Sequence, residues 1–341
     1  MIFYLIIMQI SNSYIDLPEK IKLSLQNANI FFSESYERNS IERGQHLLYL
    51  WSEYHVLVAR IKQKFFLKAA VLESEPFVLK EGEDEKDFLN VAMMGLKNQG
   101  IQWAVVANTA RFQTYPSSCY VVPCGNHIVD LTLSEEELWA KVNSKHRNSI
   151  RRGEKVGIEI ISGGIELVKD FAPLANMTYS RSGKSDAGES YYQSLMKNLE
   201  NNAIIMLACK DKELQSAGMF YYNNEMAYYL HGASIARPEP GATNFLLWKA
   251  MLHFKNLGVK SYSFVGYHYN PEPGSKLDGI QRFKERFGGE LEKSYNFRCE
   301  FNKLAYKVFC FVMQLKARKL FEKYQDPIDK QIHNYADLNK G

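Results

Sequence analysis

The hydrophobic and polar positions of the chain repeat one succession of elements in its two halves. In the first half, short apolar runs with tight links predict a meander of strands, followed by a helix and a further strand. These elements are expected at 46–71, 88–96 and 101–106. The second half shows the same order at 203–231, 244–257 and 259–265. Gly100 and Gly258 end the two helices, and the shared order favours an internal duplication.

A basic helix is predicted between the two copies. Ser134 and Glu137 have the spacing of a capping box, and the helix that begins there carries lysines and arginines as far as Arg152. A strand and two helices follow at 157–161, 165–179 and 191–200. The second half therefore reads strand, two helices, three strands, helix, strand, helix, strand. That is the order of the GNAT acyltransferase fold, a mixed α/β sheet.

The fold class expected from this order is α/β with a mixed sheet, arranged as two tandem GNAT-like domains. We place the first domain at residues 1–132 and the second at 133–300. An amphipathic helix over 301–325 is expected to pack on the first domain, because its large apolar side chains share one face. Residues 1–10 are apolar, lack a preceding positive segment and are too few to span a membrane, so a first strand or an upstream start-site extension is expected there.

Composition narrows the class of protein. The chain has 341 residues, of which 46% are hydrophobic and 23% are charged, so wholesale disorder is excluded. The net charge of +4 is compatible with an anionic partner but does not require one. Five cysteines occur without a C-x-x-C pair, and we interpret them as buried, reduced thiols of a cytoplasmic protein.

Few side chains stand out as candidates for chemistry. The sequence contains no zinc-hydrolase, nucleophile-elbow, phosphate-loop or dinucleotide-binding motif, and we predict neither a metal nor a redox cofactor. Lys284 is a lone cation among apolar residues that include Phe283 and Phe287. A surface lysine on an amphipathic turn is the alternative. His231 ends a strand and is expected to be a structural histidine.

Basic residues at two places have the chemistry to bind phosphate. Arg147 and Arg151 lie one helical turn apart, with Lys145 on the same helix, and repulsion between the two arginines favours a bound anion. A solvated helix face is the alternative. Arg181 ends a helix, where it either complements the helix dipole or binds a phosphate through its forked donors.

Four stretches, taken together, resemble the Fem family of peptidoglycan aminoacyltransferases, the FemABX group. They lie at 129–160, at 177–185, at 229–234 with 240–251, and at 279–289, within a resemblance that covers about residues 33–290. The resemblance implies an enzyme that moves an amino acid from aminoacyl-tRNA to an amine of the stem peptide of a UDP- or lipid-linked peptidoglycan precursor. The chain is similar to the compact members, which lack a long coiled-coil arm.

The resemblance also implies roles for individual residues. Phe283 and Lys284 match the family's Phe-Lys pair, which contacts the tRNA acceptor end and stabilises the transferring ester. Arg181 matches an arginine that holds the diphosphate of the precursor, and Arg38 and Tyr267 are placed in the same substrate site. Asn108 stands where the family often has an acidic residue, so no carboxylate base is assigned.

The expected reaction is acylation of an amine, with Lys284 stabilising the oxyanion. The alternative is an acyl-CoA-dependent N-acyltransferase of the GNAT fold that acts on a cell-envelope or polysaccharide substrate. GNAT enzymes bind the CoA pyrophosphate on backbone N–H groups, at the place where this chain has Pro238, Glu239 and Pro240. The two prolines remove two donors and the glutamate repels phosphate. A non-catalytic binding protein of the same fold is a third alternative; a peripheral contact with the inner membrane face and the oligomeric state are left open.

Overall fold

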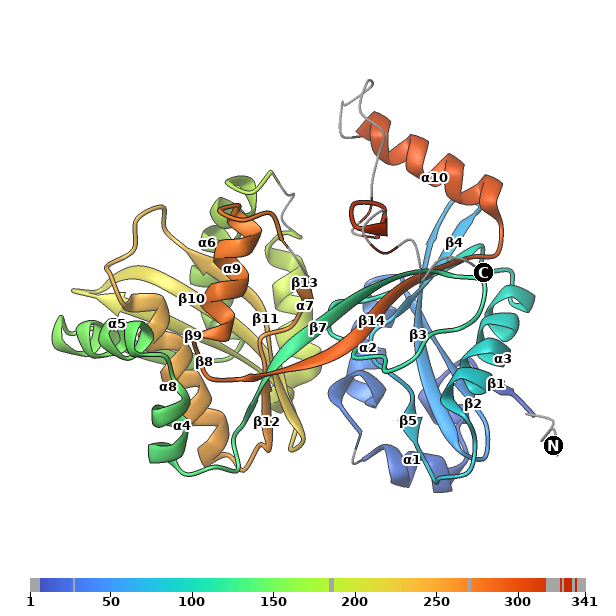
Figure 1. Ribbon diagram of the computed structural model, residues 1–341, viewed down its shortest axis with the longest axis horizontal. Coiled ribbons are helices and arrows are strands. Elements are labelled where there is room, and N and C mark those ends of the chain that lie inside the picture. Colours follow the sequence, from blue (N-terminus) through green and yellow to red (C-terminus); the bar gives the residue numbers. More distant parts are fainter. Residues whose placement is uncertain are drawn as a thin grey trace. The chain divides into compact units, whose positions relative to one another are not determined.

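A computed structural model describes residues 7–26, 28–183, 187–268, 271–316, 326, 328–332 and 335. The side chains of Tyr267, His268 and Lys316 lie outside the described part. The chain divides into two compact units (Figure 1): the first unit is 1–125 with 293–341, and the second unit is 126–292. The second unit is thus one continuous stretch, whereas the first is assembled from two.

The first unit is a mixed sheet covered by helices. Its strands are β1 (Gln9–Ser11), β2 (His46–Trp51), β3 (His55–Lys64), β4 (Leu67–Leu72), β5 (Phe77–Val78), β6 (Trp103–Val106) and the part of β14 (Glu290–Glu300) that follows residue 292. Its helices are α1 (Glu19–Leu25), α2 (Glu34–Glu42), α3 (Glu85–Asn98) and α10 (Lys303–Lys316). The strand order is β1-β2-β3-β4-β6-β14, with β5 beside β3. Helix α3 buries Phe88, Leu89, Ala92 and Leu96 in the core of this unit.

The second unit is a sheet with the order β7-β12-β11-β10-β9-β8. Its strands are β7 (Tyr120–Asp130, from residue 126), β8 (Glu159–Gly163), β9 (Ala203–Lys210), β10 (Glu213–Tyr222), β11 (Met226–Ser234), β12 (Ser261–Ser263) and β13 (Tyr267–His268). Its helices are α4 (Glu135–Lys141), α5 (Ser144–Lys155), α6 (Val168–Ser180), α7 (Glu189–Leu199), α8 (Ala242–Asn256) and α9 (Lys276–Glu285). From β8 to β14 the elements follow the order predicted from the sequence, apart from the short strand β13, and the mixed α/β fold class is confirmed. The single basic helix predicted from Glu135 is wrong: it is divided into α4 and α5, because Val142 is extended and Asn143 caps a new helix.

Both faces of this second sheet are buried. Met206 and Ala208 of β9 join the core beneath α8, and their neighbours Ile205 and Leu207 are buried too. Since successive residues of a strand point to opposite faces, the sheet has a helix layer on each side. Helix α8 packs along β9 and β10, while α6 packs along β11.

The two units share one internal arrangement. In the first, β2, β3 and β4 form an antiparallel meander, α3 follows, and β6 returns parallel to β4. In the second, β9, β10 and β11 form the meander, α8 follows, and β12 returns parallel to β11. Gly100 and Gly258, which follow the two helices, both have left-handed backbones, with φ of 75° and 78°. The match extends the predicted duplication from element order to strand direction.

One sequence-based expectation about the cysteines is wrong. Cys119, just before β7, is disulfide-bonded to Cys299 of β14, with their Cα atoms 4.4 Å apart. Cys124, Cys209 and Cys310 are free, as expected. The two bonded residues are 180 positions apart, so the local spacing of the cysteines could not predict the bond.

Helix α10 packs on the first unit through one face. Tyr306 and Phe309 lie against Trp103, with ring centroids 5.6 and 4.9 Å from it. None of the helices in the described ranges has the length and apolar character needed to cross a bilayer. Of the apolar N-terminal run, residues 1–6 lie outside the described part, and Gln9–Ser11 form the first strand.

Candidate functional site

Lys284 lies in the last turn of α9, and two backbone carbonyls hold its ammonium group. The side chain of Ser275 caps the start of this helix by accepting from the N–H of Asp278. At the other end, Lys284 Nζ donates to the carbonyl oxygens of Val265 and Gly266, the second at 2.8 Å. Val265 has φ of 44°, which is a strained conformation for a β-branched residue. The strained turn after β12 thus presents its carbonyls to the lysine.

The environment of Lys284 opposes its positive charge. The lysine is half-buried, and burial lowers its pKa from the usual 10.5 to about 8. On the same helix, Phe283 packs edge-on against the buried Phe287 at 5.3 Å, and Phe287 stacks on Phe264 at 5.1 Å. At neutral pH the site therefore holds a cation beside a dry aromatic cluster, where its field is screened less than in water.

A buried histidine that the sequence did not single out ties α5 to this lysine. His146 Nε2 lies 3.0 Å from the carbonyl oxygen of Phe283, which can only accept, so the imidazole donates from Nε2. The same ring contacts Phe283 and Phe287, with centroids 5.0 and 4.7 Å away. Burial lowers the pKa of His146, so the imidazole is neutral at pH 7. His146 thereby fixes the backbone immediately before Lys284.

A second neutral histidine lies beside α9. His127 of β7 is buried, and its Nε2 is 3.9 Å from Oε1 of Glu285. Burial lowers the pKa of His127, and a hydrogen bond with the backbone of Gly289 and the charge of Glu285 only partly offset this. Neither imidazole belongs to a sequence motif, so only the fold identifies them.

Arg181 lies at the end of α6 and is fixed to the end of β11. Its Nη2 donates to the carbonyl oxygen of Ser234 at 2.5 Å and to Oγ1 of Thr178 at 3.2 Å. The guanidinium group is otherwise exposed, which leaves further donors available to a ligand. Lys276, at the start of α9, donates to Ser182 Oγ at 2.7 Å. The loop that follows Arg181 therefore lies at the start of α9, whereas Lys284 lies at its end. Lys276 and Lys284 are eight residues apart, which corresponds to about 12 Å along the helix.

His231 has the structural role expected from the sequence. Its Nδ1 is 2.8 Å from the hydroxyl of Tyr179, and its ring contacts those of Tyr191 and Tyr192. These partners fill the surroundings of the imidazole at the end of α6 and the middle of β11.

The three basic residues predicted on α5 have different surroundings. Arg147 Nη1 donates to three carbonyl oxygens near the end of α4, those of Trp139, Ala140 and Val142, at 3.3, 3.0 and 2.7 Å. Arg147 thus satisfies carbonyl groups at the end of α4 and interacts favourably with the dipole of that helix, so no bound anion is needed to explain its position. Arg151 is exposed and lies over the indole of Trp139, 5.3 Å from the ring centroid. Lys145 is exposed in the first turn of α5, where the helix dipole disfavours a cation.

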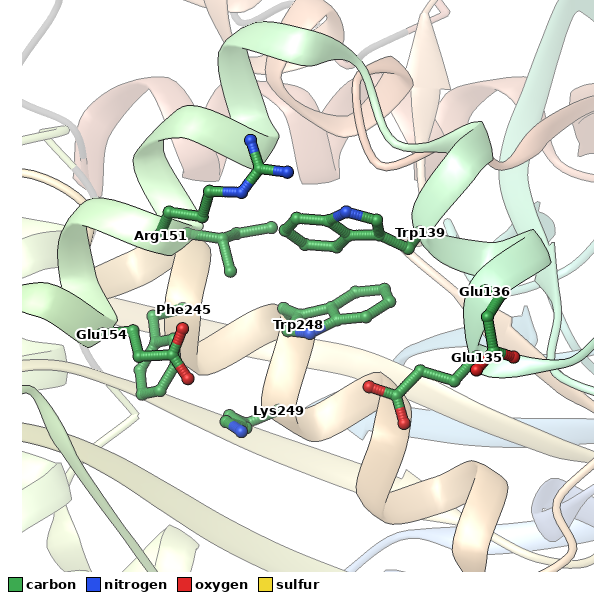
Figure 2. Close-up of a pocket in the computed structure, with 9 residues that line it drawn as sticks. Glu135, Glu136, Trp139, Arg151, Glu154, Phe245, Trp248 and Lys249 are labelled. Atoms are coloured by element: carbon green, nitrogen blue, oxygen red, sulfur yellow. The ribbon is translucent and has the colours of Figure 1, made fainter.

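Arg151 and Trp139 border a pocket of about 340 Å³ between α4, α5 and α8. Figure 2 shows Arg151 and Trp139 side by side above Trp248. The two indole centroids are 5.0 Å apart. The lining residues are Glu135, Glu136, Trp139, Ile150, Arg151, Glu154, Phe245, Trp248 and Lys249. An aromatic surface with a flanking guanidinium suits stacking of a flat ring.

Two further residues, Arg38 and Tyr267, were predicted to bind the substrate. Arg38 lies on α2 of the first unit, is exposed, and pairs with Oε1 of Glu34 at 3.0 Å. Its neighbours Tyr36 and Glu37 are buried in that unit. The side chain of Tyr267 lies outside the described residues.

The start of α8 is closed by contacts within the protein. Gly241 has φ of 97°, and a Cβ at this position would lie 2.3 Å from the carbonyl oxygen of Ser149 on α5. Only glycine allows the two backbones to approach this closely. Glu239 pairs with Lys210 at 2.8 Å and with Arg152 at 3.7 Å. The carboxylate of Glu239 and the packed helix α5 therefore lie at the start of α8, the helix end at which GNAT enzymes bind a pyrophosphate.

Comparison with known proteins gives a consistent result. Residues 89–214 match the FemAB family. A relative, the Lipid II:glycine glycyltransferase of Staphylococcus haemolyticus (strain JCSC1435), is 22% identical and aligns over 74% of this chain and 73% of its own length. The sequence match therefore covers the basic helix and extends well beyond it.

Solved structures share the fold at low identity. The crystal structure of FemX has a TM-score of 0.66 at 14% identity, covering 88% of this chain and 99% of FemX. The C-terminal domain (DUF2156) of a putative lysylphosphatidylglycerol synthetase from Agrobacterium fabrum has a TM-score of 0.55 at 16% identity, covering 87% of this chain and 96% of that domain.

Proposed function

Because the chain belongs to the FemAB family, we propose that it is an aminoacyltransferase that adds an amino acid to an amine of a peptidoglycan precursor. The observation that carries this proposal is the setting of Lys284. A half-buried ammonium group, held by two carbonyls and bordered by aromatic rings, is suited to stabilise negative charge on an ester oxygen. The relative's name, Lipid II:glycine glycyltransferase, supports a lipid-linked acceptor.

The proposed donor is an aminoacyl-tRNA. Its 3′-ester is already activated, so the protein has to position the attacking amine and stabilise the oxyanion. The amine nitrogen forms the new bond to the carbonyl carbon, the ester bond to the ribose oxygen breaks, and the amine proton passes to that leaving oxygen. Arg151, exposed beside Trp139, supports contact with a single-stranded nucleic acid. Arg181 supports binding of the diphosphate of the acceptor.

The acyl-CoA alternative has less support. Ion-paired Glu239 and the close approach of Ser149 to Gly241 occupy the start of α8, and the N–H of Ala242 already donates to the carbonyl of Glu239 at 3.0 Å. A pyrophosphate there would meet a carboxylate and few free N–H groups.

The choice of donor is tested by offering both. The purified chain is incubated with mixed charged tRNAs or with acetyl-CoA, together with a UDP-linked or a lipid-linked precursor. The expected result is discharge of one class of aminoacyl-tRNA and loss of transfer after RNase treatment. Transfer that survives RNase and requires CoA would establish the acyl-CoA alternative instead.

A further inference from the structure

Two aromatic side chains project from the tip of the β3–β4 hairpin in the first unit. Phe65 and Phe66 are 82% and 68% exposed, and Phe65 is the most exposed large apolar residue in the described part of the chain. Phe65 also has φ of 54°, where glycine or asparagine is the ordinary choice. Neither core packing nor turn geometry accounts for a phenylalanine at this position.

Helix α10 carries a second exposed apolar stripe. Tyr306 and Phe309 face the first unit, while Leu304, Phe311, Val312 and Leu315 are 73%, 58%, 41% and 44% exposed. The spacing of these four residues places them along one side of the helix. The amphipathic helix predicted from the sequence thus has a second apolar side that docking on the first unit leaves uncovered.

The hairpin tip and α10 belong to one local surface. Gln102 links them. Its side-chain Nε2 donates to the backbone carbonyl of Phe66 at 2.9 Å, and its backbone carbonyl accepts from the N–H of Asn302, just before α10, at 2.9 Å. Leu67 of β4 and Phe309 of α10 pack in the same cluster around Trp103. Figure 1 shows the end of the β3–β4 hairpin beside α10.

The charges on these two segments have one sign. Residues 61–68 include Lys62, Lys64 and Lys68, and residues 301–316 include Lys303, Lys307 and Lys316. Neither segment contains an aspartate or a glutamate. Exposed apolar side chains on segments whose only charged residues are lysines match an interface rich in anionic lipid headgroups.

We propose that the hairpin tip and the outer side of α10 form a membrane-binding surface that inserts Phe65, Phe66, Phe311 and Leu315 among anionic lipids. A lipid surface accepts exposed apolar side chains without a complementary groove, and the lysines would lie at the headgroups. The biological purpose rests on the proposed function, because a lipid-linked acceptor lies at such a surface. The binding itself does not depend on that function.

The test is flotation of the full chain with vesicles. Vesicles of phosphatidylcholine alone are compared with vesicles containing about 30 mol% phosphatidylglycerol, at about 0.1 M salt. We expect binding to the anionic vesicles that weakens as salt is raised. Phe65→Asn with Phe66→Gly keeps a favourable turn and removes both rings, and we expect it to lower the partition coefficient at least tenfold. Lys64→Gln with Lys307→Gln should lower it about 25-fold, at roughly fivefold per lysine.

Controls separate this surface from other causes. Leu23→Asn removes a leucine of α1 that is 64% exposed, and it should leave vesicle binding unchanged. Equal binding of the wild type and the Phe65→Asn, Phe66→Gly variant, or no binding to anionic vesicles, would overturn the proposal. So would a concentration-dependent dimer that Phe311→Gln abolishes, if vesicle binding is absent, because the stripe would then be covered by a second copy of the chain.

Transfer assays keep the two proposals apart. With a water-soluble acceptor, the hairpin variant should transfer at the wild-type rate, and with a vesicle-embedded acceptor it should lose activity in proportion to binding. If no acceptor is modified while the chain still floats with anionic vesicles, the proposed function fails and the membrane surface stands.

Discussion

Lys284 has a charge that its surroundings disfavour, which makes its removal informative at the scale of a single residue. We predict that Lys284→Met lowers kcat by about 10²–10³, the scale for loss of an oxyanion donor, with a smaller effect on KM. Stability should change little, because the free energy that burial of the charge costs below pH 8 offsets the loss of the two hydrogen bonds to Val265 and Gly266. Steady-state kinetics and thermal unfolding check both parts; a variant that turns over at the wild-type rate removes Lys284 from the mechanism.

The same residue predicts a pH dependence. With a folded pKa of about 8, the ammonium form is lost as pH rises through that value, and kcat should fall with it. The contribution of Lys284 to the free energy of unfolding rises between pH 8 and 10.5, because there the unfolded state binds the extra proton. Lys284→Arg stays charged across this range and serves as the control: its kcat, however low, should not show the alkaline fall.

His146 is predicted to position Lys284 and not to react. His146→Leu leaves the carbonyl of Phe283 without its hydrogen-bond donor. For a buried carbonyl this lowers the free energy of unfolding by about 1–3 kcal/mol. We expect kcat to drop about tenfold with KM nearly unchanged, which corresponds to a rise of the barrier by about 1.4 kcal/mol. His146→Gln keeps an N–H donor and should recover most of the rate. A purely structural residue would lower the melting temperature of both variants without separating their kcat values.

At the scale of elements, α5 tests the nucleic-acid hypothesis. Arg151 and Lys145 are exposed on this helix, whereas Arg147 is bound to the end of α4. Replacing Lys145 and Arg151 by Gln should reduce the slope of log K against log salt by about 0.7 for each phosphate of a single strand that the variant no longer neutralises. Filter binding of aminoacyl-tRNA at several salt concentrations measures this. Lys155→Gln, on the same helix, is the matched control, and an equal slope in all three proteins would assign α5 to a solvated surface.

The sequence predicted elements well where burial is periodic. The meander at 203–231, the helix ending at Gly258 and the capping box of Ser134 with Glu137 all occur as predicted, because each depends on local geometry and on one buried face. The surroundings of Lys284 could not be predicted from the sequence. Val265 is an unexpected residue for a left-handed turn, and the hydrogen bond of His146 to Phe283 joins residues 137 positions apart. Such interactions arise from tertiary packing, which periodicity does not encode.

At the scale of the whole molecule, the path of the chain matters more than its periodicity. Strand β14 begins in the second unit and pairs with β6 of the first, where Arg298 lies opposite Val105. The alternation of apolar and polar residues in a strand does not indicate which strand it pairs with. The predicted second domain therefore ended at residue 300, after β14, whereas the observed second unit ends at residue 292. The first unit is therefore complete only when the chain has returned through β14 and α10.

The Cys119–Cys299 disulfide joins the two segments from which the first unit is assembled. It closes a loop across 180 positions, which restricts the unfolded chain strongly. We predict that Cys119→Ser with Cys299→Ser destabilises the first unit by about 2–4 kcal/mol and leaves the second unit unchanged. Calorimetry of the full chain should show one transition moving to lower temperature while the other stays in place. Cys124→Ser, which removes a free thiol of the same unit, is the control and should move neither. Five titratable thiols in the protein purified and unfolded without reductant would contradict the bond, since three are expected when Cys119 and Cys299 are paired.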